Sequence, residues 1–214
     1  MTESIPQSGP WPPALPLVAI LRGLQPERAV DIARVLFDAG FRALEVPLNR
    51  PGAIAAIAAV VRIAPADACI GAGTVLDVAQ VDAVGDTGAT LIVSPHFDPA
   101  VVRRARDRGM RTVPGVFTAS EAFAAWRAGA SALKIFPAEA MTHAGLKGLT
   151  TVLPADVQLW PVGSIAPDNM AAWRRAGATG FGLGGGLFKP ELSVADIGAR
   201  ARAYVDAWNA SAPA

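Results

Sequence analysis

The sequence predicts an α/β protein and, within that class, a single-domain (β/α)8 TIM barrel. Short continuous apolar runs of strand length alternate with amphipathic helix patterns eight times along the 214 residues. Continuous rather than alternating apolar runs are typical of strands buried on both faces. A helix between consecutive strands requires parallel pairing. An open doubly wound sheet fits the same pattern and is the alternative.

The elements follow one another in a regular order after a lead-in over residues 1–14. That lead-in is rich in Pro, Ser and Gly and is expected to be flexible, and the barrel domain is expected over residues 15–210. The predicted strands are residues 15–21, 43–46, 69–71, 90–93, 111–113, 131–136, 157–162 and 179–183. The predicted helices are residues 26–40, 51–64, 77–88, 98–109, 118–129, 145–153, 167–177 and 193–208.

Glycine marks the ends of the predicted helices. Five of them end in the words DAGF, DTGA, DRGM, RAGA and RAGA. Glycine adopts the left-handed conformation that closes a helix without a steric penalty, and a short link then leads into the next strand. This repeated ending supports a series of equivalent strand–helix units.

Composition excludes several classes of function. The net charge is +1, so no global field attracts nucleic acid or a membrane surface. Five arginines between residues 103 and 111 lie near aspartates and lack aromatic partners for base stacking, which favours a solvated helix face. One cysteine, Cys69, and two histidines, His96 and His143, make a disulfide impossible within the chain and a structural metal site improbable. With no secretory signal or membrane-length apolar stretch, a cytoplasmic protein is expected.

Lys134 is the main candidate for chemistry. It lies inside the apolar strand of residues 131–136, in the word ALKIFP. Burial disfavours the charged ammonium and lowers the pKa of the amine, and a neutral amine attacks carbonyl carbons to begin Schiff-base chemistry. The alternative is a lysine at a strand end whose amine reaches solvent.

Other polar groups follow the predicted strands at the same end, where the active site of a barrel lies. Glu45 stands in the apolar word ALEV, and burial would raise its pKa so that it exchanges protons near neutrality. A surface position is the alternative for Glu45. Thr74 follows the word GAG and either contributes to the site or caps the next helix. Arg22 either binds a substrate carboxylate or pairs with an acidic neighbour.

Glycine-rich turns follow the last two predicted strands and favour a phosphorylated ligand. Glycine leaves backbone N–H groups accessible, and the usual phosphate site of a barrel lies after these two strands. The run of residues 182–186 lacks the acidic partner of a dinucleotide site, so that motif is set aside. The candidate phosphate-binding residues are Gly163, Ser164, Gly184 and Gly185.

Seven words in order resemble the class I aldolases that cleave 2-keto-3-deoxy-6-phospho sugar acids. They are LPLVAILRG, ALEVPLN, IGAGTVLD, LIVSP, ALKIFP, PVGSIAPDN and GLGGGL, and the resemblance runs from about residue 15 to residue 208. It implies a (β/α)8 barrel, a homotrimer, no metal and no cofactor. It also implies a phosphorylated keto sugar acid as substrate and pyruvate as a product.

Within this family, the words ILRG and EVPLN resemble the galactonate-type branch, which cleaves 2-dehydro-3-deoxy-6-phospho-D-galactonate to pyruvate and D-glyceraldehyde 3-phosphate. The gluconate-type branch usually shows EVTLRT and is the alternative, together with 4-hydroxy-2-oxoglutarate cleavage. Three departures bear on the sugar preference. Ser164 stands where a second glycine is common, Gly185 stands where a phosphate-binding serine often lies, and Arg50 lies beside the gluconate-type arginine position.

The resemblance implies a role for each candidate. Lys134 forms the imine and Glu45 moves protons. Arg22 and Thr74 hold the substrate carboxylate, and Pro95 and Phe136 line the pocket. Two rivals of other classes remain: a phosphosugar isomerase or synthase that uses Lys134 only as a charge, and a non-catalytic barrel that binds an anionic sugar or a protein.

Overall fold

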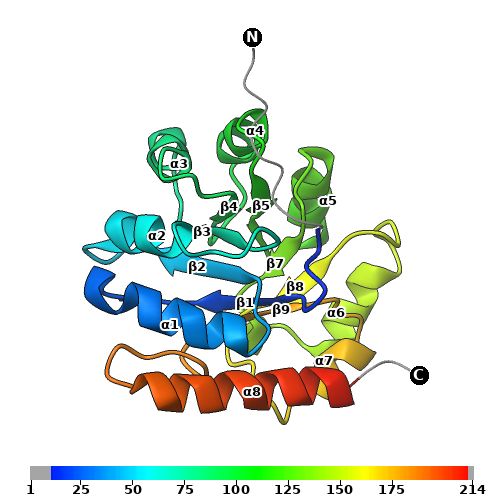
Figure 1. Ribbon diagram of the computed structural model, residues 1–214. Helices are drawn as coiled ribbons and strands as arrows, with labels where there is room; N and C mark the ends of the chain where they lie inside the picture. Colours follow the sequence, from blue (N-terminus) through cyan, green and yellow to red (C-terminus); the bar gives the residue numbers. More distant parts are fainter. Residues whose placement is uncertain (1–10, 212–214) are drawn as a thin grey trace.

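Parallel β-strands surrounded by helices form the core of the protein (Figure 1). The computed structural model describes residues 11–211. Six strands pair in the order β5-β4-β3-β2-β1-β9 and three in the order β6-β7-β8, with every pairing parallel. The strands are β1 (Leu17–Ile20), β2 (Ala43–Pro47), β3 (Cys69–Gly73), β4 (Leu91–Val93), β5 (Arg111–Val113), β6 (Gly115–Val116), β7 (Leu133–Ile135), β8 (Leu159–Pro161) and β9 (Phe181–Leu183).

The connections between consecutive strands carry helices, with one exception between β5 and β6. The helices are α1 (Pro26–Asp38), α2 (Ala53–Val61), α3 (Val78–Gly85), α4 (Pro99–Asp107), α5 (Ala119–Arg127), α6 (His143–Thr150), α7 (Met170–Arg175) and α8 (Val194–Ala210), with a 3-10 turn η1 (Ala138–Ala140) before α6. The fold is therefore α/β with a curled parallel sheet.

Most of the strands and helices are shorter than predicted by a few residues, and three differences have a bearing on the site or its surroundings. The strand predicted over residues 111–113 continues after Pro114 as β6, because proline has no N–H to donate and interrupts the ladder. The helix predicted over residues 145–153 begins earlier, at His143, because Thr142 caps it by accepting a hydrogen bond from Gly145 N at 2.9 Å. The helix predicted over residues 167–177 is only Met170–Arg175.

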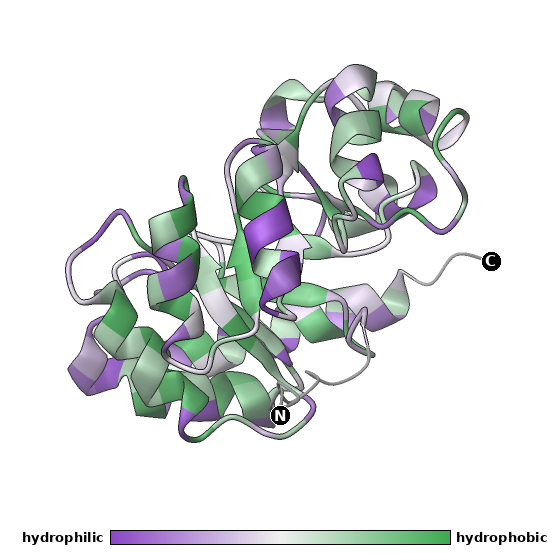
Figure 2. Ribbon diagram, turned by 90° about the horizontal axis from the view of Figure 1, so that it is seen from above, coloured by the Kyte–Doolittle hydropathy of each residue, from purple (hydrophilic) through white to green (hydrophobic). Residues whose placement is uncertain are grey.

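Two groups of buried side chains form the core. The larger group fills the space between the sheet and its helices, and the strands at the centre of Figure 2 are mostly green, that is, hydrophobic. The smaller group lies inside the curl of the sheet and combines residues from both sets of strands. Its members are Val18, Ala43, Leu91, Val93, Val113, Ala132 and Trp160. This inner layer forms the floor beneath the site described below.

Trp11 closes the inner layer at the amino ends of the strands. Its ring lies 5.0 Å from the Trp160 ring, and its Nε1 donates a hydrogen bond to Ser131 O at 2.9 Å. The flexible lead-in expected over residues 1–14 mostly lies outside the described residues. Within the described part, Trp11 is held against the core rather than loose.

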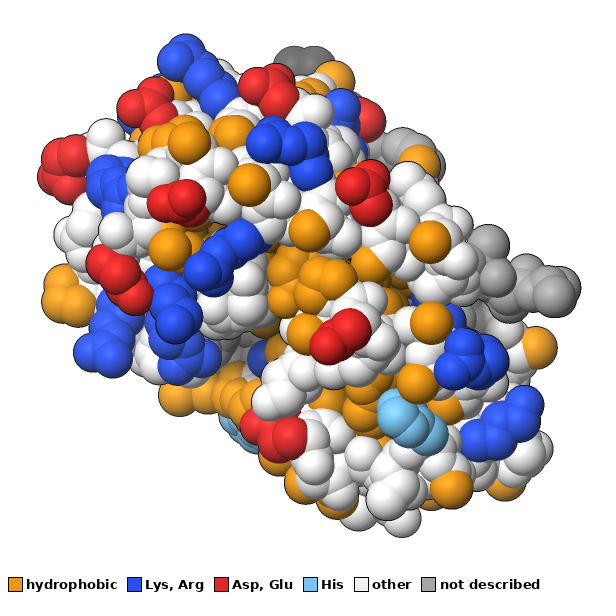
Figure 3. All heavy atoms as spheres, turned by 90° about the horizontal axis from the view of Figure 1, so that it is seen from below, with side chains coloured by type: hydrophobic (Ala, Val, Ile, Leu, Met, Phe, Trp, Pro, Cys, Tyr) orange, Lys and Arg blue, Asp and Glu red, His pale blue; other side chains and the backbone are white. Residues whose placement is uncertain are grey.

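The surface carries charges of both signs, which are interspersed over the face shown in Figure 3. Arg104 of α4 and Arg108, the residue that follows this helix, pair with Asp82 of α3 at 2.8 and 2.9 Å. Arg106 donates to Ala128 O at 3.0 Å. These arginines of the 103–111 run are thus engaged in contacts between neighbouring elements. Within residues 11–211, no helix combines the length and the apolar character needed to cross a bilayer.

Candidate active site

The alternation of side chains along each strand places Glu45 and Lys134 inside the curl of the sheet. Ala43 and Ala132 belong to the inner layer of the core. Because side chains two residues apart on a strand point to the same face, Glu45 and Lys134 also point inward, one step nearer the carboxyl ends of the strands. The two residues are 1% and 7% exposed.

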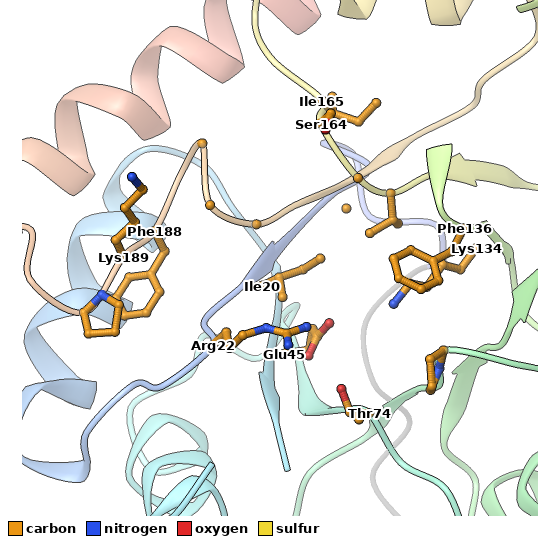
Figure 4. A pocket seen from close by; sticks show the side chains of 18 residues that line it. Ile20, Arg22, Glu45, Thr74, Lys134, Phe136, Ser164, Ile165, Phe188 and Lys189 are labelled. Carbon is orange, nitrogen blue, oxygen red and sulfur yellow. The ribbon is translucent and has the colours of Figure 1, made fainter. Parts of the chain in front are cut away.

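A cavity of about 380 Å³ opens at these carboxyl ends. Figure 4 shows the Lys134 amine and the Glu45 carboxylate pointing into it, with Arg22 extending toward Glu45. Every residue that the sequence nominated for the site lines this cavity: Arg22, Glu45, Thr74, Pro95, Lys134, Phe136, Gly163, Ser164, Gly184 and Gly185. The structure brings all ten together, while their roles remain predictions.

Lys134 is held in an apolar environment. Its backbone N–H donates to Pro114 O at 2.9 Å, and its Nζ lies 4.6 Å from the centre of the Phe136 ring. Burial lowers the pKa of the Lys134 amine; the Glu45 carboxylate acts in the opposite direction, and the Arg22 guanidinium lowers the pKa further. The alternative of an amine in bulk solvent is therefore wrong.

The Glu45 side chain is also buried away from solvent. Burial raises its pKa from 4.5 to about 7, against the opposing charges of Lys134 and then Arg22. Its Oε2 accepts no hydrogen bond from the described residues. Gly73 lies directly behind the carboxylate, since a Cβ at that glycine would fall 1.7 Å from Glu45 Oε2. A carboxyl group with this pKa can both accept and return a proton near neutral pH.

Lys134 and Glu45 approach one another without direct contact. Within residues 11–211, neither Lys134, Glu45 nor Arg22 forms an ion pair with an N···O distance of 4.0 Å or less. The gap leaves room for a substrate or a water molecule between amine and carboxylate. Arg22 is exposed at the cavity rim, so its cationic group is available to an anionic ligand.

Thr74 does not cap the helix that follows it. The cap of α3 is Asp77, whose side chain accepts from Gln80 N at 2.8 Å. Instead, Thr74 has a φ of +56°. A β-branched residue in this left-handed region is strained, and such strain persists only where the surrounding structure fixes it. The surrounding structure therefore fixes Thr74 at the cavity wall.

The opposite end of the cavity is formed by backbone. Ser164 has a φ of +52° and Gly163 one of +116°. The N–H groups of Ser164, Ile165, Gly185 and Gly186 donate no hydrogen bond within residues 11–211, whereas the neighbouring Ala166 N–H donates to Asn169 Oδ1. Unpaired amides grouped in a concave surface are suited to an anion such as phosphate.

Eight further residues line the cavity that were not among the named site candidates: Ile20, Val162, Ile165, Gly182, Gly186, Phe188, Lys189 and Pro190. Two of them, Gly182 and Gly186, belong to the glycine run from which the sequence predicts a phosphorylated ligand. Ile20 and Val162 follow inner-layer residues by two positions, so strand alternation could have found them. Nothing local to Phe188 or Lys189 signals that the chain turns back over the cavity. His143 lies elsewhere, with its ring edge-on against Trp173 at 4.4 Å.

A buried lysine and a buried carboxyl group line one cavity at the carboxyl ends of parallel strands, an arrangement that is suited to Schiff-base chemistry of the kind used by lysine-dependent aldolases. The model of the KDPG and KHG aldolase family matches residues 13–198. The chain therefore belongs to the KDPG and KHG aldolase family.

Individual members of this family show which proteins the chain is similar to. The chain is 46% identical over 202 residues to a probable 2-dehydro-3-deoxy-6-phosphogalactonate aldolase of Rhizobium meliloti (strain 1021), covering 94% of this chain and 95% of that protein. It is also 46% identical over 198 residues to the 2-dehydro-3-deoxy-6-phosphogalactonate aldolase of Escherichia coli (strain K12), covering 92% and 97%. A solved structure described as native KDPGal superimposes with a TM-score of 0.92 at 45% identity, covering 94% of this chain and 98% of that one.

Proposed function

We propose that the protein is a class I aldolase that cleaves 2-dehydro-3-deoxy-6-phospho-D-galactonate to pyruvate and D-glyceraldehyde 3-phosphate. The observation that carries the proposal is that Lys134 and Glu45 are both buried and line the same cavity, in a chain 46% identical to two aldolases named for this substrate.

The reaction begins when the neutral Lys134 amine attacks the C2 ketone. Loss of water from the resulting carbinolamine gives a protonated imine, which withdraws electrons from the C3–C4 bond. Glu45 accepts the proton of the C4 hydroxyl, and the C3–C4 bond breaks. C4 leaves as the aldehyde carbon of D-glyceraldehyde 3-phosphate, and the electron pair of the broken bond forms an enamine that includes C3. The protonated Glu45 returns its proton to C3, and water then hydrolyses the imine to release pyruvate and regenerate the amine.

Binding uses the two ends of the cavity. Arg22 and Thr74 hold the carboxylate near the reacting carbon, and Pro95 and Phe136 line the walls. The phosphate lies against the amides and small residues of the far end. The proposed phosphate-binding residues are Gly163, Ser164, Gly184 and Gly185.

Borohydride trapping tests the imine. The chain has three lysines, Lys134, Lys147 and Lys189, so peptide mapping separates the proposed site from two internal controls. Incubation with pyruvate and borohydride should add one pyruvate-derived mass at Lys134 alone, and Lys134→Ala should lose both the label and turnover. An isomerase, a synthase or a non-catalytic barrel would take up no label.

Side-by-side cleavage assays with the two 6-phospho sugar acids test the substrate. The galactonate-derived acid should be cleaved with the higher kcat/KM. Preference for the gluconate-derived acid, or for 4-hydroxy-2-oxoglutarate, would assign the protein to the alternative branch.

The proposal includes a closed eight-stranded barrel, forming one domain over residues 15–210. Three features support closure. β5 and β6 are separated only by Pro114, a parallel bridge joins Val162 to Gly182, and strands of both sheets contribute to the inner layer. We further propose that the protein is located in the cytoplasm, since a single cysteine is typical of proteins from a reducing compartment.

A homotrimer is part of the same proposal. Ile54 and Leu76 are 38% and 46% exposed. Both lie beside Gln80, which shares a shallow groove with Ile54 and accepts from Leu76 N at 2.7 Å. Neighbouring apolar side chains of this size are suited to an interface between copies. Sedimentation should show a trimer that Leu76→Asp dissociates and that Val152→Asp, at a separate exposed position, leaves intact.

A further inference from the structure

Tyr204 of α8 lies beneath both loops that form the phosphate end of the cavity. It is 2% exposed, and its hydroxyl donates a hydrogen bond to Ile165 O in the β8–α7 loop at 2.8 Å. A Cβ at Gly186, in the β9–α8 loop, would fall 2.2 Å from the same hydroxyl oxygen. One side chain thus contacts two loops that are about twenty residues apart in the sequence.

The β8–α7 loop needs such support because it is strained. Ser164 is in the left-handed region with a φ of +52°. Asn169 Nδ2 donates to Ser164 O at 2.9 Å, and Tyr204 fixes the next carbonyl, Ile165 O. In a trans peptide, the N–H of one residue points opposite to the carbonyl of the residue before it. Holding Ser164 O toward Asn169 therefore turns the Ile165 N–H to the other side of that peptide.

The β9–α8 loop is held from the same helix. Arg200, one turn before Tyr204, donates from Nη1 to Gly186 O at 3.1 Å. Residues four positions apart lie on one face of a helix, so α8 presents Arg200 and Tyr204 to the same pair of loops. The Tyr204 hydroxyl is protonated at neutral pH and can donate, because the ordinary pKa of tyrosine is 10.0 and burial raises it further.

We propose that Tyr204 is a positioning residue that sets the spacing of the two loops, and thereby the affinity of the site for the phosphate of the substrate. The inference rests on the proposed function, in that it assumes a phosphate at the Ser164 and Gly185 end. Tyr204 itself does not line the cavity. It acts through the backbone amides, so its loss affects the phosphorylated end of a ligand and not the imine at Lys134.

Tyr204→Phe tests this inference because it removes only the hydroxyl. KM for the phosphorylated sugar acid and the inhibition constant of inorganic phosphate should each rise about 5- to 10-fold, as expected for one lost hydrogen bond. The kcat value and pyruvate trapping at Lys134 should stay within about 2-fold. With the sugar acid that lacks the phosphate, kcat/KM should not change. Arg202→Gln, on an exposed turn of the same helix, is the matched control.

Gly186→Ala provides a second, independent variant. The added methyl group would collide with the Tyr204 hydroxyl and should weaken phosphate binding more than Tyr204→Phe does. In the double variant, the missing hydroxyl makes room for the methyl group, so phosphate affinity should recover toward that of Tyr204→Phe alone. Additive losses in the double variant, or a loss in Tyr204→Phe that is equal for substrates with and without phosphate, would overturn the inference.

The phosphate measurements separate this inference from the proposed function. Inorganic phosphate can be titrated into the wild-type protein and into Tyr204→Phe whatever sugar acid is cleaved. If the two proteins bind phosphate equally well and both are trapped normally at Lys134, the proposed role of Tyr204 is wrong and the aldolase proposal stands. If Tyr204→Phe binds phosphate more weakly but the wild-type protein shows no trapping at Lys134, the aldolase proposal is wrong and the positioning role of Tyr204 stands.

Discussion

The fold raises the pKa of the Glu45 carboxyl group by burying it away from water. Its pKa of about 7 means that the proton-accepting form is populated only as the pH rises through neutrality. We expect kcat/KM to fall tenfold per pH unit below about pH 7. A pH–rate profile on the phosphorylated acid measures this directly. An acidic limb near the ordinary pKa of 4.5 would contradict a role for buried Glu45 as the base.

The same carboxyl group should make the fold less stable at high pH. Because its folded pKa lies above its unfolded value, the folded state binds the proton more tightly. Its contribution to the free energy of unfolding is complete below pH 4.5 and is lost as the pH rises to about 7. Glu45→Gln removes the ionisation. It should therefore be more stable than wild type at pH 8, by roughly 2–3 kcal/mol, and should lack turnover.

Urea unfolding at pH 5 and pH 8, at one protein concentration, measures this effect. The stability difference between Glu45→Gln and wild type should be small at pH 5 and grow with pH. The exposed Glu191→Gln should show no such trend. A difference that is equal at both pH values would mean that packing of the amide, rather than ionisation, is responsible.

The two central residues of the site could be predicted because each breaks the pattern of its own strand. A lysine inside ALKIFP and a glutamate inside ALEV are charges where an apolar residue is expected, and burial then follows from the strand prediction. Tyr204 could not be predicted, because an aromatic residue on the inner face of a helix has the same pattern whether it only packs or also fixes a loop.

Among the elements, β3 shows how a strand can fix the position of a side chain on its neighbour. Gly73 leaves the space that the Glu45 carboxylate fills. Gly73→Ala would displace that carboxylate, which should lower kcat/KM by about two orders of magnitude. It should also lower the free energy of unfolding by about 1–3 kcal/mol, since the added methyl group overpacks the site.

Gly148→Ala is the control for Gly73→Ala. Gly148 lies inside α6, and a Cβ there would meet no atom within 4 Å. Alanine in a helix interior should raise the free energy of unfolding by about 0.5–1 kcal/mol with unchanged activity. Activity and denaturation measurements on both variants decide the point. Normal activity in Gly73→Ala would show that the carboxylate has freedom to move.

Element positions were predictable where strand and helix patterns are strong, and boundaries failed where a side chain makes a specific contact. Pro114 separates the fifth predicted strand, which is β5, from the short strand β6 that was not predicted. The Asn169 side chain bonds to the loop before α7 rather than starting the helix earlier. The left-handed Thr74 and Ser164 also escaped prediction. Neither residue type signals a positive φ.

On the scale of the whole molecule, the repeat of strand, helix and glycine predicted the α/β class and the shared end at which the polar groups meet. Parallel strands joined by helices all have their carboxyl ends on one side of the sheet. Residues from seven separate segments could therefore be predicted to lie close together. Which residues form the inner layer was harder to predict from the sequence. Trp11 joins it from a segment whose composition predicts only a flexible lead-in.

Trp11 should stabilise the molecule without affecting catalysis. It packs on Trp160 and bonds to Ser131 at the amino ends of the strands, whereas the cavity lies at the carboxyl ends. Trp11→Ala should lower the free energy of unfolding by about 2–3 kcal/mol and leave kcat and KM unchanged. Trp11→Phe keeps an aromatic ring but loses the hydrogen bond, so it should lose only about 1 kcal/mol. Denaturant unfolding and steady-state kinetics on both variants test the separation. A change in kcat would show that the inner layer transmits its packing to Lys134, and an unchanged stability would show that the amino-terminal segment does not close the core.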